Sequence, residues 1–432
     1  MKKVLSLLLV VAMVFAAVGC SAAPSGEAAA PSNASAGTEA ATSAEPVTIS
    51  WAINETANLT REQYMVIVDE FEKAHPEIKV DLQLYNTGEA DYLTKIAAGT
   101  LCDVNHDVAG IANVDGALLE VPEWLSSKWD SQYLFTVDGK INSVPVCGQG
   151  QMCVVYHKDA FTAAGLEEPT TWEEFIKVCD TFVANGQAPL MGYGAASADW
   201  FSQVWCLYSL SNVLKSGYDD VNAALRNGSA KWTDQAITDA VSQFQSWNAN
   251  GYFYEGSASL DYTNATVEFQ NGATPMMIDG VWSLTGLDPE AYGMFFVPDG
   301  TKLSEMFTCY WGVSAASEHP DAAWTFIDWV LTGDGLKYYT EQILAKDAQV
   351  SLVKDAPSYD MDPLVAEFYD LLMNDMTAYI SVFLAGGDAA LPSGFAAYVY
   401  SEMSKVFFEN ADVSATMAEI QTEYETFLSE QG

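Results

Sequence analysis

The chain has 432 residues, with 58 acidic and 18 basic side chains and a formal net charge of −40 at pH 7. This acidic excess excludes nucleic acid as a partner, because binding phosphate requires a basic face. It also disfavours anionic ligands and favours cationic ones through the long-range field, although acidity that keeps an extracellular protein soluble is the simpler explanation.

The first twenty residues follow the pattern of a lipoprotein signal peptide. Two lysines precede an apolar run over residues 4–18, and residues 17–20, Ala-Val-Gly-Cys, resemble a lipoprotein signal-peptidase site. The apolar run is shorter than the ~20 residues that span a bilayer comfortably. We therefore predict cleavage after residue 19 and a lipid on the sulfur of Cys20, with a single transmembrane anchor as the alternative.

The next segment, residues 21–46, consists almost entirely of Ala, Ser, Gly, Pro, Thr and Glu. This composition cannot build a hydrophobic core, so we predict a flexible tether. Folded sequence begins with the β-branched run VTISW at residues 47–51. Residues 47–432 are too many for one ordinary core and favour two lobes.

Helix and strand signals alternate after this first strand. Residues 60–63 have capping-box spacing and open a helix that Pro76 ends, and residues 78–82 alternate like a half-exposed strand. Residues 92–99 are predicted to form a helix with a glycine stop, and residues 102–104 the next strand. The buried face of the first helix is predicted to be Tyr64, Ile67, Val68 and Phe71. This βαβαβ order predicts a parallel sheet with helices on both faces.

A second block of signals lies in residues 138–182. An extended apolar run over residues 152–156 leads into a short helix that Gly165 stops. A second capping box, from Thr171 to Glu174, then opens another helix. The buried face of that helix is predicted to be Phe175, Val178, Cys179 and Phe182.

These short motifs occur in an order that resembles that of one large protein family. The succession DGK, VP, a strand ending in YHKD, then AGL, EP and TTWEEF resembles the extracellular solute-binding proteins of ABC importers, in the carbohydrate-binding group that includes maltose-binding protein. His157 stands where that pattern usually has Asn. Residues 267–282 resemble the family's motif F-x-G-x-x-x-M-x-x-x-G-x-W. Residues 309–315 and 322–331 match the C-terminal part of the family's sequences. The resemblance therefore covers nearly all of residues 47–432.

The resemblance implies an α/β, two-lobed, type II periplasmic-binding-protein-like fold, with the ligand in a cleft between lobes that hinge crossings join. Residues 145–150 look like the first crossing, and its glycines permit the torsion changes of closure. The expected division is a signal peptide at 1–19, a lipidated linker at 20–46, an N-terminal lobe at 47–146 plus 289–340, and a C-terminal lobe at 147–288 plus 341–432.

The function implied by the resemblance is binding without catalysis. The chain would capture an extracellular sugar or oligosaccharide and deliver it to the permease subunits of an ABC transporter, as a monomer lipid-anchored to the outer face of the cytoplasmic membrane, with no cofactor or metal. Two alternatives stay open. One is a binding protein for a polyamine or another cationic solute, and the other is a secreted glycoside hydrolase that uses a carboxylate pair.

Sugar sites combine flat aromatic surfaces with polar side chains that make several hydrogen bonds. Trp282 matches a family residue whose ring stacks on sugar, with a core aromatic as the alternative. Tyr310 and Trp311 stand at a strand start that faces the cleft in the family pattern. Asp199 and Trp200 lie in a loop of small residues at the expected rim of the second lobe.

Four further residues complete the predicted site. Asn54 and Glu55 follow the first strand and Asp107 follows residues 102–104, where doubly wound sheets present ligand contacts. Tyr398 matches a C-terminal aromatic position of the family. Four other tryptophans lie in helical patterns and are predicted to pack in the core: Trp172, Trp247, Trp324 and Trp329.

Six cysteines remain besides Cys20. They form no CxxC pair and the chain has four histidines, so a zinc site has little support. Several of these cysteines lie in apolar patterns, which favours buried thiols and leaves disulfide pairing open.

Overall fold

The computed structural model describes residues 45–56, 59–85, 89–194 and 210–431. Residues 45–432 form one compact unit, and the description below concerns that unit. The predicted signal peptide, Cys20 and most of the predicted tether lie outside the described residues, as do Asp199 and Trp200.

The first sheet has five strands in the order β2-β1-β3-β11-β4. Strands β1 and β2 run parallel along their whole length, whereas β11 is antiparallel to both β3 and β4. The strands are β1 (Val47–Ile53), β2 (Ile78–Leu84), β3 (Val104–Asn105), β4 (Val144–Pro145) and β11 (Tyr310–Val313). The predicted strand at 102–104 therefore lies two residues further along, as β3.

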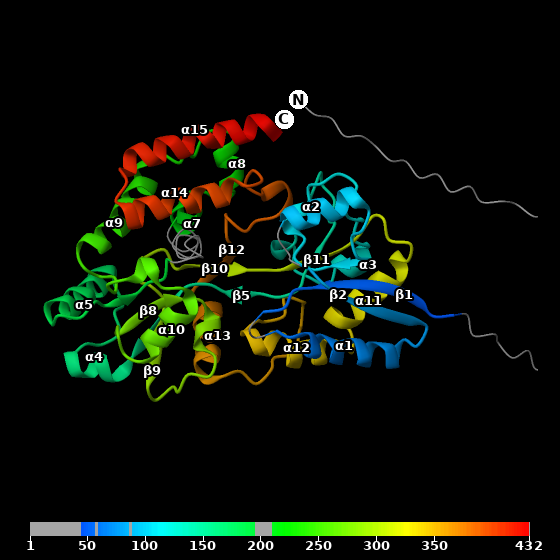
Figure 1. Ribbon diagram of the computed structural model, residues 1–432, viewed down its shortest axis with the longest axis horizontal. Coiled ribbons are helices and arrows are strands. Elements are labelled where there is room, and N and C mark those ends of the chain that lie inside the picture. Colours follow the sequence, from blue (N-terminus) through cyan, green and yellow to red (C-terminus); the bar gives the residue numbers. More distant parts are fainter. Residues whose placement is uncertain (1–44, 57–58, 86–88, 195–209, 432) are drawn as a thin grey trace, which may run out of the picture. The chain divides into compact units, whose positions relative to one another are not determined.

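Helices cover this sheet on both sides (Figure 1). Helix α1 packs against α11 and α12, while α2 and α3 lie across the sheet from them. The helical segments here are α1 (Arg61–Ala74), α2 (Glu89–Ala98), η1 (Ala109–Ile111), α3 (Glu123–Ser126), η2 (Ser131–Tyr133), α11 (Pro320–Thr332), α12 (Leu336–Gln342) and η6 (Leu344–Asp347). The predicted capping box and all four predicted buried residues of α1 are confirmed.

The second sheet has four strands in the order β7-β8-β6-β9. Strand β6 is antiparallel to both of its neighbours, β8 and β9. The strands are β6 (Cys153–His157), β7 (Leu190–Met191), β8 (Met276–Asp279) and β9 (Tyr292–Phe295). The antiparallel register pairs Cys153 with Asp279, so the carboxyl end of β8 lies where the chain first enters this sheet.

Among the helices associated with the second sheet, α4 and α5 follow their sequence signals closely. In α5, the Thr171 hydroxyl accepts a hydrogen bond from the Glu174 amide at 3.2 Å, and the Glu174 carboxylate accepts one from the Thr171 amide at 3.2 Å. All four predicted buried residues of α5 are confirmed. The helical segments are α4 (Lys158–Ala164), α5 (Trp172–Ala184), α7 (Ser211–Gly217), α8 (Val221–Arg226), α9 (Gln235–Ala249), η4 (Ser257–Ser259), α10 (Tyr262–Gln270), η5 (Val281–Leu284), α13 (Pro363–Asp375), η7 (Gly387–Ala389), α14 (Phe395–Glu409) and α15 (Val413–Gln431).

A third, smaller sheet connects the two larger ones. Its order is β12-β10-β5, with β12 parallel and β5 antiparallel to the central strand. The strands are β5 (Gln149–Gly150), β10 (Leu303–Phe307) and β12 (Thr377–Ile380). Strand β5 leads from the first sheet to the second and β10 leads back, so this sheet has the position of a hinge.

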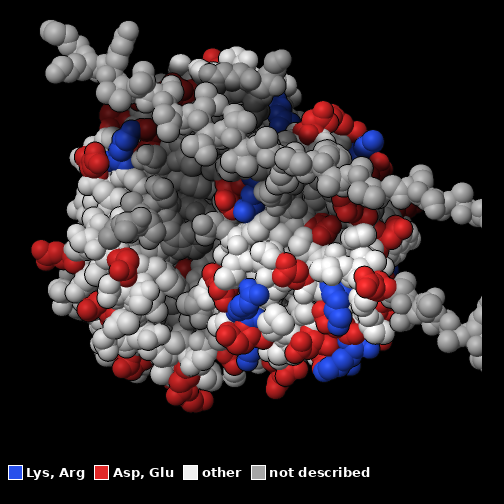
Figure 2. Space-filling model, turned by 45° about the vertical axis from the view of Figure 1, so that its right-hand side comes forward, with Lys and Arg blue, Asp and Glu red and all other residues white. Residues whose placement is uncertain are grey.

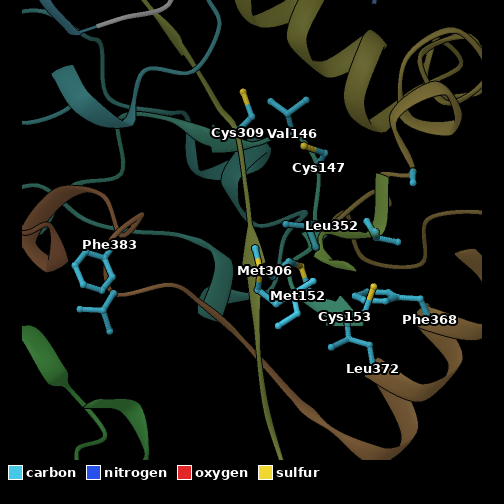
Figure 3. Close-up of a cluster of buried hydrophobic side chains, with 14 of the residues drawn as sticks. Val146, Cys147, Met152, Cys153, Met306, Cys309, Leu352, Phe368, Leu372 and Phe383 are labelled. Carbon is cyan, nitrogen blue, oxygen red and sulfur yellow. The ribbon is translucent and has the colours of Figure 1, made fainter. Parts of the chain in front are cut away.

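A sulfur-rich apolar cluster packs around these crossings (Figure 3). Its members include Cys147, Met152, Cys153, Met306 and Cys309, all buried. Polarisable sulfur side chains fill irregular gaps well, which suits a place where three chain segments meet. All five cysteines among the described residues are buried free thiols, as the apolar patterns predicted.

The two glycines of the first crossing are required by close packing. A Cβ built on Gly148 would lie 2.4 Å from the sulfur of Met306, and one built on Gly150 would lie 2.1 Å from Cε1 of Phe368. Such distances are far inside van der Waals contact. Neither residue has the positive φ that only glycine adopts readily. In this conformation, glycine is therefore required because there is no space for a side chain, and not because of the backbone torsion.

The strand pairing suggests where the lobes divide. The division predicted from the sequence assigned residues 289–340 to the first lobe, but β9 within that range pairs with β6 of the second sheet. Helices α11 and α12 pack on the first sheet as expected. We therefore propose that the second lobe extends to β10 and that the first lobe resumes after it.

Candidate functional site

A cavity of about 690 Å³ is lined by residues of both lobes, and we call it the Asp107 chamber. The first lobe contributes the segment that follows β3 together with one residue of α2. The second crossing contributes Phe307 and Thr308, and the second lobe contributes residues around 383–396. The lining residues are Leu93, Asp107, Ala109, Gly110, Asn113, Val114, Arg226, Phe307, Thr308, Phe383, Leu384, Ala385, Ala390, Leu391, Pro392, Ser393, Gly394 and Ala396.

Asp107 occupies this chamber just past the carboxyl end of β3, where its position had been predicted. Its backbone has a φ of 53°, in the left-handed region that Asp adopts more readily than most residues. Burial disfavours the charged carboxylate and raises the pKa of Asp107 to about 6. A carboxyl held in a sparsely populated backbone conformation on a cavity wall is typical of a functional position.

The residue before it, His106, connects Asp107 to the core. The Trp311 indole N–H donates to Nδ1 of His106 at 2.9 Å, and the thiol of Cys309 lies 3.4 Å from Nε2. Burial disfavours the charged imidazolium and lowers the pKa of His106 to about 4. The ring is therefore neutral near pH 7, and accepting at Nδ1 places its proton on Nε2.

A second cavity of about 500 Å³, the Tyr310 chamber, is also lined by both lobes. Tyr310 packs on Phe135 with the ring centroids 4.6 Å apart, and its hydroxyl donates to the Tyr133 carbonyl at 2.8 Å. The lining residues are Gln132, Tyr133, Leu134, Phe135, Lys215, Asp219, Asp220, Val221, Asn222, Tyr310, Thr377, Ala378, Tyr379, Ile380, Val382, Ala385, Gly386 and Ala389. Ala385 lines both chambers.

A group of aromatic residues surrounds a buried carboxyl at the carboxyl end of β8. Oδ1 of Asp279 accepts from the Gly280 amide at 2.9 Å and from the Tyr193 hydroxyl at 3.5 Å. The Tyr193 and Tyr262 rings meet edge to face with centroids 5.4 Å apart. Burial raises the pKa of Asp279 to about 7, against the lowering effect of these donors.

Trp282 belongs to this group and is half-buried in η5. A Cβ built on Gly280 would lie 2.1 Å from the Trp282 ring, so the indole lies directly on the glycine backbone. Gly280 is therefore glycine because a side chain would displace that ring. The motif Gly-x-Trp has a physical basis here, since the glycine fixes where the tryptophan can lie.

The other predicted residues occupy different places. Trp311 is fully buried between Trp51, Phe326 and Tyr339, so we now assign it to the support of His106 rather than to direct contact with ligand. Tyr398 lies in α14, packed beside Phe395 and Phe427 and outside the linings of both chambers.

Asn54 and Glu55 lie near the start of α1 and line neither chamber. The Glu55 carboxylate accepts from the Arg61 amide at 2.6 Å, and the Asn54 carbonyl accepts from the Tyr64 hydroxyl at 3.3 Å. Both contacts hold the helix start in place, which is a structural role. Of the predicted site residues that the structure describes, Asp107 and Tyr310 line the two chambers.

Three contributors were missed at the sequence level. Asp279 carries a usable signal, because it ends a strand directly before the Gly-x-Trp motif. Arg226 lines the Asp107 chamber from α8, and residues 382–391 line both chambers, but neither has a local pattern that indicates a site. Their positions depend on contacts between segments that are distant in sequence.

The described part of the chain holds no helix long and apolar enough to cross a membrane. Within the same residues, no group of three or more His, Cys, Asp or Glu side chains is arranged to hold a metal ion. Figure 2 shows Asp and Glu side chains spread over the visible face, with Lys and Arg scattered among them.

Comparison with known proteins agrees with this architecture. The family model for bacterial extracellular solute-binding proteins matches residues 57–336. The chain is 24% identical over 301 residues to a multiple sugar-binding protein of Streptococcus mutans, an alignment that covers 63% of this chain and 69% of that protein.

Two solved structures show the same fold. A chitin oligosaccharide binding protein aligns with a TM-score of 0.72 at 19% identity, over 88% of this chain and 98% of that chain. The solute-binding protein RafE in complex with raffinose aligns with a TM-score of 0.69 at 20% identity, over 88% of this chain and 99% of that chain. Both have the type II periplasmic-binding-protein-like arrangement that the family resemblance implied.

Proposed function

The chain belongs to the bacterial extracellular solute-binding protein family, and we propose that it captures a sugar or oligosaccharide between its lobes and delivers it to the permease of an ABC transporter. In this mechanism the ligand binds one lobe of an open form, the second lobe closes over it, and the closed form docks on the permease. The bonds of the ligand are neither made nor broken.

The observation that carries this proposal is the composition of the Asp107 chamber. Apolar side chains such as Leu93, Phe307 and Phe383 provide surfaces for the C–H faces of sugar rings. A few polar groups, including Asp107 and Asn113, can bind hydroxyls. A volume of about 690 Å³ is within the usual range for small-molecule sites. Known relatives named for multiple sugars, raffinose and chitin oligosaccharide support the same ligand class.

A cationic solute such as a polyamine is the second candidate. The observation that favours it is Asp279, whose carboxyl lies among Tyr193, Tyr262 and Trp282, because aromatic faces and a carboxylate together attract ammonium groups. The strong acidity of the chain favours it as well. An ammonium ligand would, however, need Asp279 ionised, which its burial opposes.

The ligand class is tested by thermal unfolding of the purified protein with a panel of mono- and oligosaccharides, polyamines and amino acids. A ligand at 100 times its dissociation constant adds about 2.7 kcal/mol of stability. A rise in melting temperature with a sugar is the expected result. A rise with spermidine and no sugar would contradict the sugar proposal and favour the second candidate.

A secreted glycoside hydrolase is not proposed, because the family is one of binding proteins. Incubation of the bound sugar with purified protein, followed by chromatography, is expected to return the sugar unchanged. Release of shorter products would reverse this assignment.

We further propose that residues 1–19 are removed and that a lipid on Cys20 anchors the protein, as a monomer, to the outer face of the cytoplasmic membrane. The family's extracellular designation supports a location outside the cytoplasm. Mass spectrometry of the N-terminal peptide from the native membrane tests the anchor, and an unmodified Cys20 or an intact residue 1 would contradict it. Sedimentation of the delipidated protein tests the monomer.

A further inference from the structure

Residues 382–391, which we call the strap, lie between the Asp107 chamber and the Tyr310 chamber. The strap connects β12 to the turn before α14, in the orange-brown segment of Figure 1. Phe383, Leu384 and Leu391 face the Asp107 chamber, whereas Val382, Gly386 and Ala389 face the Tyr310 chamber. The strap is therefore the common wall of two cavities that both lobes line.

Asp388 fastens the strap to the first lobe. Its amide donates to the Thr136 carbonyl at 2.7 Å, and its carboxylate accepts from the Thr136 hydroxyl at 2.8 Å and from the Asp138 amide at 3.2 Å. The Asn113 side-chain amide donates to the Gly387 carbonyl at 3.1 Å. One exposed aspartate thus makes three hydrogen bonds to two residues of the opposite lobe.

Two glycines allow this close approach. Gly387 has a φ of 62°, in the left-handed region, and a Cβ built on it would lie 2.3 Å from the Thr136 carbonyl oxygen. A Cβ built on Gly386 would lie 2.4 Å from the Phe135 ring. The sequence Gly-Gly-Asp is therefore the smallest shape that can lie against residues 135–136 and still present a carboxylate to them.

The other side of the strap is held by the second lobe, through α8. The Asn222 side-chain amide donates to the Ala389 carbonyl. The Arg226 guanidinium donates to the carbonyls of Asp388 and Ala390, the latter at 2.7 Å. Because the strap also continues covalently into β12 and α14, we expect it to move with the second lobe. Opening must then break the three hydrogen bonds of Asp388 and the one between Asn113 and Gly387.

We propose that the strap is a specificity element that excludes the ligand from the Tyr310 chamber, with Asp388 as the residue that locks the strap in place. In this conformation a ligand bound beside Asp107 cannot extend into the Tyr310 chamber, because the strap fills the space between them. The lock therefore sets an upper limit on ligand size. This inference rests on the proposed sugar-binding function and adds a size limit to it.

The test compares the wild-type protein with Asp388→Ala and Thr136→Val, which remove the carboxylate or the hydroxyl of the same contact. Asp360→Ala, at another exposed aspartate in a loop, is the matched control. All four proteins are titrated with sucrose, raffinose and stachyose and with malto-, xylo- and chito-oligosaccharides of increasing length. Hydrogen exchange of residues 382–391 is measured without sugar.

Wild type is expected to protect the Asp388 amide and to lose affinity once a series exceeds a limiting length. Asp388→Ala is expected to speed exchange in the strap and to raise affinity for the longest member relative to the shortest, each by about tenfold, the effect of one or two lost hydrogen bonds. Thr136→Val should change the strap exchange rate and the relative affinity for the longest sugar in the same direction as Asp388→Ala. Asp360→Ala should change neither quantity.

Equal strap exchange in wild type and Asp388→Ala would overturn the lock. An unchanged size profile in a protein whose strap is released would overturn the size limit. If no sugar binds the wild-type protein, the proposed function and the size limit that rests on it are both contradicted. The Asp388 lock is judged separately, by whether the strap of the wild-type protein is protected from hydrogen exchange.

Discussion

The indole N–H of Trp311 donates a 2.9 Å hydrogen bond to Nδ1 of His106, the residue that precedes Asp107. Trp311 is fully buried in the first-lobe core, whereas Asp107 faces the chamber between the lobes. The core thus holds the loop that carries the proposed binding carboxyl, and we propose that ligand recognition depends on Trp311 although the ligand would not touch it.

Trp311→Phe tests this relationship. Phenylalanine keeps an aromatic ring but removes the donor and leaves some space, so the free energy of unfolding should fall by about 2 kcal/mol. Because the lost hydrogen bond stabilised the neutral imidazole, the pKa of His106 should rise from about 4. NMR titration of the His106 ring measures this, and a pKa that does not change would contradict the role of the hydrogen bond.

Trp282 lines neither chamber, and we propose that the bound sugar also reaches this ring from the Asp107 chamber. Trp282→Ala should then weaken sugar binding by at least about tenfold, because it removes a half-buried ring that can stack on a sugar. Trp124→Ala is the matched control, since Trp124 is 52% exposed and lies in α3, away from the aromatic group. Both variants are measured by calorimetric titration. Equal affinities for wild type and Trp282→Ala would remove Trp282 from the proposed site.

Gly150→Ala should destabilise the protein by about 1–3 kcal/mol, because the new methyl would overlap Phe368 in the packed crossing. Gly217→Ala is the control, because a Cβ at that helix end meets nothing within 4 Å. Urea unfolding compares the two. If Gly150→Ala proved as stable as wild type, the close packing described for the crossing would be incorrect.

Glu305, in the crossing strand β10, should make stability depend on pH. Burial raises its pKa well above the ordinary 4.5, against hydrogen bonds from Tyr379 and Ser381 at 3.4 and 3.5 Å. A raised folded-state pKa means that the stabilising contribution is complete below pH 4.5 and declines as the pH rises through the folded value.

Glu305→Gln, which stays neutral, should therefore flatten this decline and be more stable than wild type at alkaline pH. Glu409→Gln, at an exposed glutamate, should leave the pH profile unchanged. Denaturation midpoints of the three proteins, measured across the pH range, test this prediction. Parallel profiles for wild type and Glu305→Gln would show that Glu305 does not titrate as its burial implies.

Local signals predicted helices α1 and α5 well, whereas the bounds of the long helices α9, α13, α14 and α15 were not predicted. Helices α1 and α5 begin at capping boxes and bury the residues that their periodicity selects. The two-residue strands β3, β4, β5 and β7 carry too little sequence to show a period, and they exist because neighbouring strands pair with them. The order of the lobes came from the resemblance to the family, since no local pattern indicates which distant segments share a sheet.

Candidate site residues could be predicted from the sequence only where a local pattern, such as a polar residue directly after a strand, indicates them. Asp107 was predicted because it follows a strand end, and it lines a cavity, but Trp311 was placed in the cleft because the family resemblance implied that its strand faces the cleft. Adjacent residues of a strand point to opposite faces, and here Tyr310 faces a chamber while Trp311 faces the core. Only the tertiary structure shows which of the two residues faces the chamber and which faces the core. The strap was missed for the same reason, because contacts with residues 113 and 136 fix its conformation.

The most direct test of sugar binding in the Asp107 chamber is calorimetric titration of wild type and Asp107→Asn with the sugar that the panel identifies. A hydrogen bond from a sugar hydroxyl to a charged acceptor contributes about 1.5–3 kcal/mol, so Asp107→Asn should weaken binding by about 10- to 100-fold at neutral pH, while Asp360→Asn leaves it unchanged. A one-to-one complex of wild type that Asp107→Asn does not weaken would contradict this location for the ligand.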